Sequence, residues 1–157
     1  MPVYIDMTAP NSGNGTSASS PLNYMPAPIV AGQEYLLKAG TFHDGVLVVT
    51  GGSMALPSKI GRYGAGDNPG MRAIQFVDCM NLEMKDMSFI QSGLPSPRVP
   101  GVIPSDYCST IRVRDCAMLG CGIGAHISPL TVGNFEILNN SILDSEEHGI
   151  AFNGTNH

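Results

Sequence analysis

Ionisable side chains gather densely at one place in this chain of 157 residues, the segment DSEEH over residues 144–148. Carboxyl and imidazole groups are the side chains that most often transfer protons as general acids and bases. Asp144, Glu147 and His148 are therefore the candidate catalytic or ligand-contacting residues. A charged run after a strand is also typical of a solvated turn, and this alternative stays open.

Other residues with possible chemistry lie apart from this cluster. Asp106 and Tyr107 fall in a proline-rich segment and form a second candidate pair. His43 and His126 stand alone near predicted strand ends, which is more typical of a structural role than of a metal ligand. The sequence contains no Asp-rich calcium loop, so we expect no metal site.

The charge balance argues against nucleic acid as a partner. The formal net charge is −5, the isoelectric point is near 5.1, and the eight basic residues are scattered along the chain. A phosphate-binding surface needs a cluster of Lys and Arg. The chain begins without a signal-peptide pattern, and its apolar stretches are far shorter than the roughly 20 residues of a membrane span.

The four cysteines show neither a CxxC pair nor a histidine at zinc-finger spacing. We therefore interpret Cys79, Cys108, Cys116 and Cys121 as buried thiols. The composition is 43% hydrophobic, only 13% charged, and rich in Gly and Pro. Such a chain is short of amphipathic helix formers and favours an all-β fold in one domain.

An internal repeat is the strongest pattern in the sequence. The segments LEMKDMSF from Leu82, IRVRDCAM from Ile111 and FEILNNSI from Phe135 align, with offsets of 29 and 24 residues. Apolar and polar residues alternate in each, with Leu138 as an exception, as in strands with one buried face. The aligned apolar residues predict three inward columns: Leu82, Ile111, Phe135; Met84, Val113, Ile137; and Phe89, Met118, Ile142. A period in the twenties with short strands predicts a stacked solenoid.

Two further sets of aligned residues lie outside the core. Asp86, Asp115 and Asn139 follow the second inward position and suit tight corners between strands. Glu83, Arg112 and Glu136 form an outward column of alternating sign, which avoids like-charge repulsion between neighbouring strands. Residues 1–34 are predicted as an entry segment and residues 35–157 as coils. The insert at 92–108 contains four prolines and is predicted as a loop that leaves the stack.

Several segments together resemble a known family, the right-handed parallel β-helix proteins of the pectate-lyase-like superfamily. The entry VYIDMTAPNSGNGTSASSPLN, the first coil VAGQEYLLKAGTF, and the coils IGRYGAGDNP and FEILNNSILDSEEHGI follow in the order typical of that family. One stretch departs from it. Relatives often place an amphipathic cap helix after the SP loop, whereas LNYMPAPIVAG contains two prolines and predicts an irregular cap or one supplied by another chain.

The resemblance implies carbohydrate as the ligand class, of the phage tailspike or tail-fibre depolymerase type that recognises bacterial surface or acidic polysaccharide. A hydrolase would need two carboxyl groups about 5 to 9.5 Å apart; a lyase would need a base and a group that neutralises a uronate, such as Ca²⁺ or Arg. Lys85 and Arg114 could hold an acidic sugar. Two alternatives stay open, a secreted lyase or hydrolase fragment and a non-enzymatic tail or baseplate protein. We expect the protein to be located in the virion.

The last coil stops in mid-pattern after GIAFNG. A solenoid coil normally covers the one before it, and the terminal coil needs a cap. We therefore expect an open C-terminal end that either continues in a longer β-helix or is closed by an oligomeric partner, such as a trimer.

Overall fold

The computed structural model describes residues 1–104, 107–127 and 134–152. Its strands are β1 (Val3–Ile5), β2 (Glu34–Lys38), β3 (Phe42–Gly52), β4 (Ser58–Tyr63), β5 (Gly70–Lys85), β6 (Ser88–Ile90), β7 (Val102–Pro104), β8 (Ser109–Arg114), β9 (Ala117–Leu119), β10 (Ile123–Ile127), β11 (Phe135–Leu138), β12 (Ser141–Leu143) and β13 (His148–Phe152). Within these described ranges, no helix is long and apolar enough to cross a membrane.

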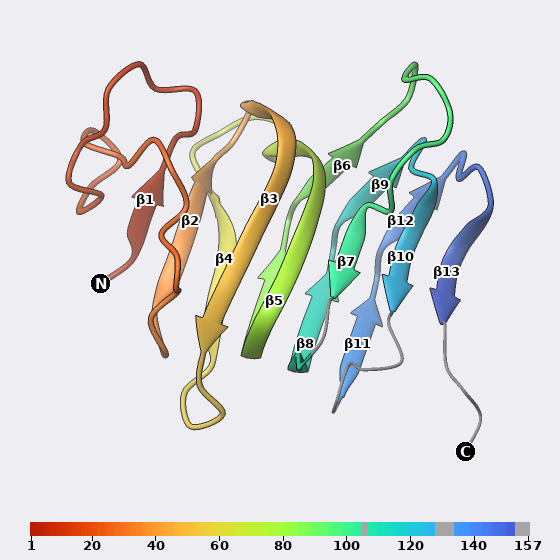
Figure 1. Cartoon of the computed structure of the whole chain (residues 1–157). Helices are drawn as coiled ribbons and strands as arrows, with labels where there is room; N and C mark the ends of the chain where they lie inside the picture. Colours follow the sequence, from red (N-terminus) through yellow and green to blue (C-terminus); the bar gives the residue numbers. More distant parts are fainter. Residues whose placement is uncertain (105–106, 128–133, 153–157) are drawn as a thin grey trace.

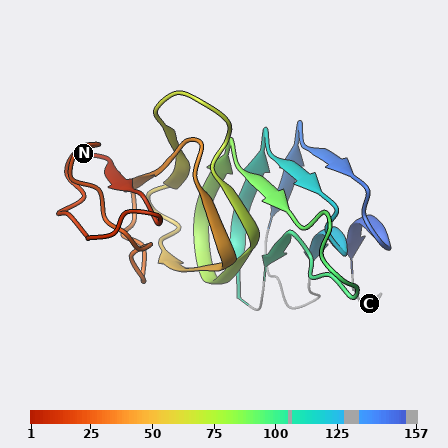
Figure 2. The same cartoon turned by 90° about the horizontal axis from the view of Figure 1, so that it is seen from above.

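The strands wind into a parallel β-solenoid of about four turns, whose coils stack side by side from the N-terminal to the C-terminal end (Figures 1 and 2). Three strips of sheet run along the stack. Face A contains β1, β2, β4, the end of β5, β8 and β11. Face B contains the starts of β3 and β5, then β6, β9 and β12. Face C contains the rest of β3, the middle of β5, then β7, β10 and β13. The predicted all-β parallel solenoid is confirmed.

The three predicted inward columns are confirmed by strand register. Leu82 pairs with Ile111 and Ile111 with Phe135, while Met84, Val113 and Ile137 stack in the same way. Phe89, Met118 and Ile142 form the third column. The members in the central coils are fully buried, and those in the last described coil are partly buried against the core. The hydrophobic core is therefore a set of continuous columns along the solenoid axis.

The corner between faces A and B repeats with one backbone conformation. Asp86, Asp115 and Asn139 have φ values of 58°, 55° and 55°, in the left-handed region. Short polar side chains tolerate this region better than others do, so the predicted corner ladder is confirmed. The hydrogen bonds at the last of these corners come from the next residue, Asn140. Its amide oxygen accepts the backbone N–H of Cys116 at 2.9 Å, and its Nδ2 donates to the Val113 carbonyl at 2.9 Å.

The corner between faces C and A also repeats, at positions that the aligned segments did not predict. Asp78 and Asn81 have φ values of 51° and 50°, and Tyr107 and Thr110, 29 residues later, have 63° and 56°. Thr110 is β-branched, and such residues adopt this region only under strain. The equivalent residue one coil earlier is Asn81, a residue type that adopts the left-handed region more readily.

Replacement of Thr110 by Asn should therefore stabilise the solenoid. We expect Thr110→Asn to raise the free energy of unfolding by about 1 kcal/mol, because it relieves left-handed strain at a β-branched residue. Urea denaturation followed by circular dichroism measures this change. Thr110→Val keeps the branching and serves as the control; equal or greater stability of the valine variant would contradict the argument.

The proline-rich segment 92–108 differs from the prediction, since it is not a loop throughout. β7 lies inside it and joins face C between β5 and β10. Val102 points into the core and is fully buried, and burial of this side chain offsets the poor strand propensity of the prolines around it. Face C therefore continues through this segment as β7, and the part before β7 projects from the stack.

The entry segment is irregular after β1, as its prolines suggested. Isolated bridges join Ile5 to Leu22 and Ile29 to Gly51, and both isoleucines are buried against the first coil. At the other end, β11, β12 and β13 each pair with one neighbouring strand among the described residues. Within that part of the chain, the outer edge of the last coil has no strand beside it.

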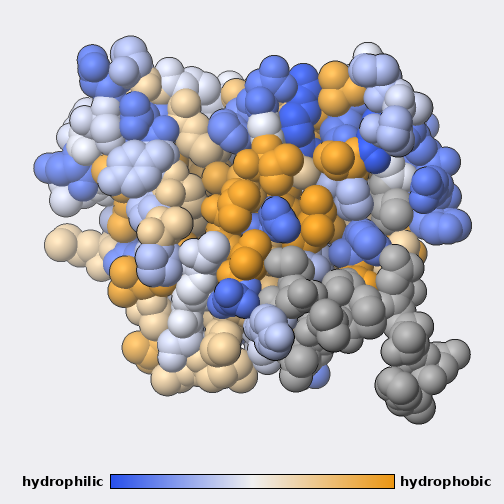
Figure 3. All heavy atoms as spheres, viewed as in Figure 1, coloured by the Kyte–Doolittle hydropathy of each residue, from blue (hydrophilic) through white to orange (hydrophobic). Residues whose placement is uncertain are grey.

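Apolar side chains also lie on the outside of the molecule, over the middle of face C. Figure 3 shows them gathered where β3, β5 and β7 lie. Val46 and Val48 on β3 contribute, with exposed fractions of 43% and 45%. This surface contrasts with face A, whose outward side chains are largely charged, so a polar ligand is better matched to face A.

Candidate functional site

The outward surface of face A carries a column of charges that alternates through five successive strands. Strand register places its members in the order Glu34, Lys59, Glu83, Arg112 and Glu136. The sequence repeat predicted the last three, and the structure adds Glu34 and Lys59. Opposite charges on neighbouring strands stabilise a sheet modestly, so alternation alone is a structural feature and no evidence for a ligand.

The ion pairs of this surface concentrate at its C-terminal half. Arg112 Nε lies 3.0 Å from Glu136 Oε2, and Arg114 Nη2 lies 2.9 Å from Glu83 Oε1. Glu83 is thus held diagonally by Arg114, although the register sets it beside Arg112. The hydrogen bond from Arg114 holds the pKa of Glu83 below its ordinary value, against the opposing effect of burial. Glu83 therefore stays ionised at neutral pH.

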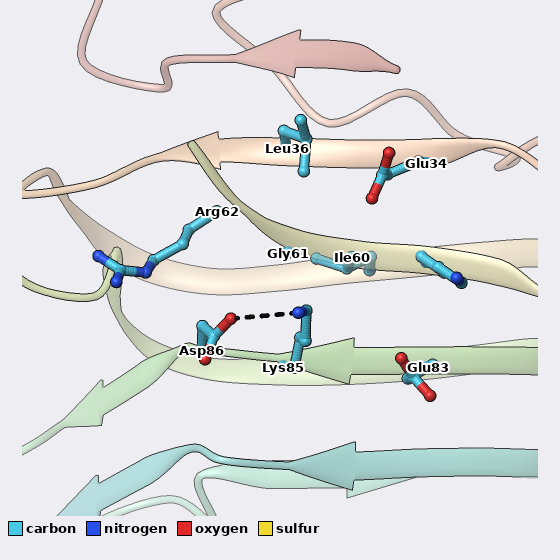
Figure 4. A pocket seen from close by; sticks show the side chains of 9 residues that line it. Glu34, Leu36, Ile60, Gly61, Arg62, Glu83, Lys85 and Asp86 are labelled. Atoms are coloured by element: carbon cyan, nitrogen blue, oxygen red, sulfur yellow. Dashed lines mark ion pairs between the residues drawn. The ribbon is translucent and has the colours of Figure 1, made fainter. Parts of the chain in front are cut away.

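A hollow opens beside this column, where the neighbouring outward column lacks a side chain. Gly61 lies between Leu36 and Lys85, and a Cβ added to it would meet Leu36 Cδ2 at 3.6 Å and Lys85 Cε at 3.9 Å. The Gly61 hollow, as we name it, has a volume of about 110 Å³. Its lining residues are Glu34, Leu36, Lys59, Ile60, Gly61, Arg62, Glu83, Lys85 and Asp86 (Figure 4). A single water needs about 10 to 15 Å³ of such space, so the hollow has room for a small substituent.

Three cations surround the hollow without a tight carboxylate partner. The Lys85 ammonium lies 3.7 Å from Asp86, a loose ion pair (Figure 4). Arg62 Nη1 donates to the backbone carbonyl of Gly66 at 2.7 Å. Among the described residues, Lys59 and Arg62 form no ion pair within 4.0 Å. Lys59 and Arg62 are also exposed, so their charges are accessible to an anionic group.

The structure separates the two basic residues that the sequence analysis proposed for sugar binding. Lys85 and Arg114 are register neighbours on β5 and β8, but only Lys85 lines the hollow. Arg114 is held by Glu83 and, at 3.4 Å, by Asp115. The guanidinium is therefore engaged within the protein, and Lys85 is the better ligand-contacting candidate.

The acidic segment at 144–148 lies elsewhere, at the turn that connects face B to face C. Asp144 has φ 54° and is exposed, and Glu147 and His148 are exposed as well. Within the described part of the chain, no hydrogen bond or ion pair joins these three side chains. The arrangement is that of a solvated turn, and a site role for these residues stays a prediction.

Glu146, which the sequence analysis passed over, is the residue of this segment with a defined contact. Its carboxylate accepts hydrogen bonds from the Ser96 hydroxyl and, at 2.9 Å, from the Arg98 backbone N–H. The Arg98 Nε lies 3.4 Å away. The hydrogen bond from Ser96 lowers the pKa of Glu146, as does that from Arg98. Through these hydrogen bonds, Glu146 holds the projecting proline-rich loop against the last described coil.

Of the second candidate pair, Tyr107 lies within the described residues. Tyr107 is 68% exposed, with φ 63°, at the corner between faces C and A, while Asp106 lies outside the described residues. Among the residues that are described, no three His, Cys, Asp or Glu side chains are grouped as they would be around a metal ion.

Comparison with protein-family models, with curated proteins and with solved structures finds no match to this chain. The class of protein is therefore defined by its fold, a parallel β-solenoid. Fold class alone does not determine a reaction or a ligand, so the function has to be argued from the surface of face A.

Proposed function

We propose that face A binds an extended acidic glycan along the solenoid axis, with the Gly61 hollow receiving one anionic substituent such as a uronate carboxylate. The observation that supports this proposal is the hollow itself. It is a gap in an otherwise filled outward column, and Lys59, Arg62 and Lys85 border it. Hydrogen bonds between charged groups are stronger than neutral ones, which favours a carboxylate over a hydroxyl group as the occupant.

The residues next to the hollow also suit the apolar side of a sugar. Tyr4, Leu36 and Gly61 follow one another in the outward column of the first coils. Sugar rings are amphipathic, with C–H faces that pack on apolar side chains and hydroxyl groups that need polar partners. The strip of Tyr4 and Leu36 beside the charged column offers both kinds of surface in the first coils.

Binding is better supported than hydrolysis at this surface. A glycoside hydrolase needs one carboxyl group that is protonated near neutral pH to act as the acid. Glu83 is instead kept ionised by Arg114, so it is unsuited to that role.

The wider setting that we propose is a phage tailspike or tail-fibre polysaccharide depolymerase, located in the virion. The resemblance of the entry segment and the repeated coils to the pectate-lyase-like superfamily supports it. Alternatives are a secreted polysaccharide lyase or hydrolase, with Ca²⁺ in the lyase case, and a purely structural tail protein. A reducing-end assay with bacterial capsule or O-antigen polysaccharide separates the enzymatic possibilities from the others.

Substitution of the residues around the hollow should weaken glycan binding selectively. We expect Lys85→Gln and Lys59→Gln each to raise the Kd for polygalacturonate about tenfold, the effect of one lost charged hydrogen bond. Gly61→Leu should have a similar effect by filling the hollow. Isothermal titration calorimetry measures these changes, with dextran as the neutral comparison.

The matched control replaces the acidic turn, with Asp144→Asn, Glu147→Gln and His148→Ala combined. This variant should bind polygalacturonate like the parent, because the turn lies away from the hollow. A weakened triple variant beside unchanged Lys59 and Lys85 variants would move the site to the acidic turn. Absence of binding to any acidic glycan would refute the proposed function.

A further inference from the structure

Two cysteines occupy equivalent places in consecutive coils. Cys79 and Cys108 are 29 residues apart, which is the offset of the coil register, since Met80 pairs with Ser109 directly after them. The left-handed residues at 78 and 81 recur at 107 and 110, so the same backbone path surrounds each cysteine. Equal backbone paths in register place the second cysteine directly over the first.

The hydrogen bonds of the two thiols confirm that their environments are equivalent. Cys79 Sγ donates to the Val49 carbonyl at 3.0 Å, and Cys108 Sγ donates to the Phe76 carbonyl at 3.4 Å. Val49 and Phe76 are themselves register partners in neighbouring coils. Both cysteines are fully buried and reduced in this structure.

We propose that Cys79 and Cys108 form a disulfide site that covalently joins two neighbouring coils of the solenoid. Neighbouring strands lie about 4.8 Å apart, and disulfides join Cα atoms that are about 4.4 to 6.8 Å apart. Register neighbours at this corner therefore meet the distance requirement without movement of the backbone.

The other two cysteines lack such a neighbour. Cys116 receives the amide oxygen of Asn140 from the next coil at its backbone N–H. Cys121 faces Gly101, where an added Cβ would lie 3.0 Å from the sulfur. Among the described residues, Cys79 and Cys108 are thus the one pair stacked in register.

Oxidation needs an acceptor, which we take to be a low-molecular-weight disulfide such as oxidised glutathione. One cysteine thiolate attacks it and releases one reduced glutathione, and the second cysteine then displaces the other, so that one protein disulfide and two reduced thiols form. The interaction of Cys79 with Cys108 and burial both raise the pKa of Cys79, which makes the thiolate scarce in the folded state. The exchange therefore takes place during folding, before the corner is buried.

The test is to refold the full chain from urea in oxidised and reduced glutathione, and then to count alkylatable thiols after denaturation. We expect the four thiols of the reduced protein to fall to two, with peptide mapping placing the disulfide between Cys79 and Cys108. The unfolding midpoint should rise and return to its original value with dithiothreitol. Cys116→Ser should form the same disulfide, whereas Cys108→Ser should not.

Two outcomes would overturn the proposal. One is the retention of four alkylatable thiols in protein that has refolded in oxidised glutathione. The other is a disulfide that maps to Cys116 or Cys121. Because both are read on the parent chain, the result does not depend on whether the Cys108→Ser variant folds.

Discussion

Val113→Asp is expected to unfold the solenoid at temperatures at which the parent is folded. Val113 is fully buried in β8, between Met84 of the preceding coil and Ile137 of the following one. A buried carboxylate without a partner costs several kcal/mol, and domains of this size are stable by only about 5 to 15 kcal/mol. A thermal melt followed by circular dichroism would show the loss of the transition or a large fall in its midpoint.

Leu138→Asp is the matched control for this prediction. Leu138 lies on the neighbouring strand β11, points outward with an exposed fraction of 48%, and pairs in register with Arg114. The new carboxylate would be solvated and near a cation, so we expect a change in stability within about 0.5 kcal/mol. Parental melting of the Val113→Asp variant would show that the inward and outward positions of this face have been assigned wrongly.

The repeated coils could be predicted because their information is local and recurs. Alternation within Leu82–Met84, Ile111–Val113 and Phe135–Ile137 identifies the buried side of each strand, since one slip of register would expose the whole set. Asp or Asn at the corner position indicates the left-handed conformation that a tight turn requires. Three aligned segments were enough to give both the coil period and the inward columns.

The long strands of the first coils could not be predicted in this way. β3 and β5 bend round corners within one strand, with irregular pairing between His43 and Val46 and between Thr50 and Gly52, so a single strand supplies more than one face. Asp78 and Asn81 turn the backbone inside β5, but in the sequence they sit within a continuous apolar pattern. β7 was missed for the opposite reason, because Pro104 and the prolines before it conceal a short buried strand.

The candidate site depends on contacts between coils, and this explains why so little of it was visible in the sequence. Gly61 creates a hollow only because strand register sets it between Leu36 and Lys85. Arg114 and Lys85 are similar in the repeat, and only the geometry shows that Glu83 engages one and leaves the other at the hollow. Glu146 and Glu147 are adjacent residues of the same type, and only the structure shows that Glu146 has hydrogen-bond partners. These partners lie about 50 residues earlier, on a loop.

The proline-rich loop before β7 crosses the coils and is held by hydrogen bonds on both sides. At its base, the buried Gln91 accepts the Val99 N–H and donates to the carbonyls of Arg72 and Val99. At its far side, Arg98 and Ser96 are bound by Glu146. In between, the chain passes directly over a glycine of the next coil.

Gly122 permits this passage, since a Cβ on it would overlap the Arg98 carbonyl group. The Gly122 N–H also donates to the Val99 carbonyl at 3.0 Å, so the two backbones are in direct contact. The Arg98 backbone cannot move aside for the new Cβ as a flexible side chain could. Gly122→Ala is therefore expected to displace the loop and to lower the free energy of unfolding by about 1 to 3 kcal/mol, the usual cost of overpacking.

Gly149→Ala provides the comparison, because its Cβ would meet only the Ile142 methyl group, at 3.8 Å, in ordinary contact. Urea denaturation should show little change for this variant and a clear loss for Gly122→Ala. Hydrogen exchange should show the cause: in Gly122→Ala, the amide of Val99, held by Gln91, should exchange faster while the core amides of β8 keep their protection. Equal protection of Val99 in the two variants would mean that the loop is not held by its passage over Gly122.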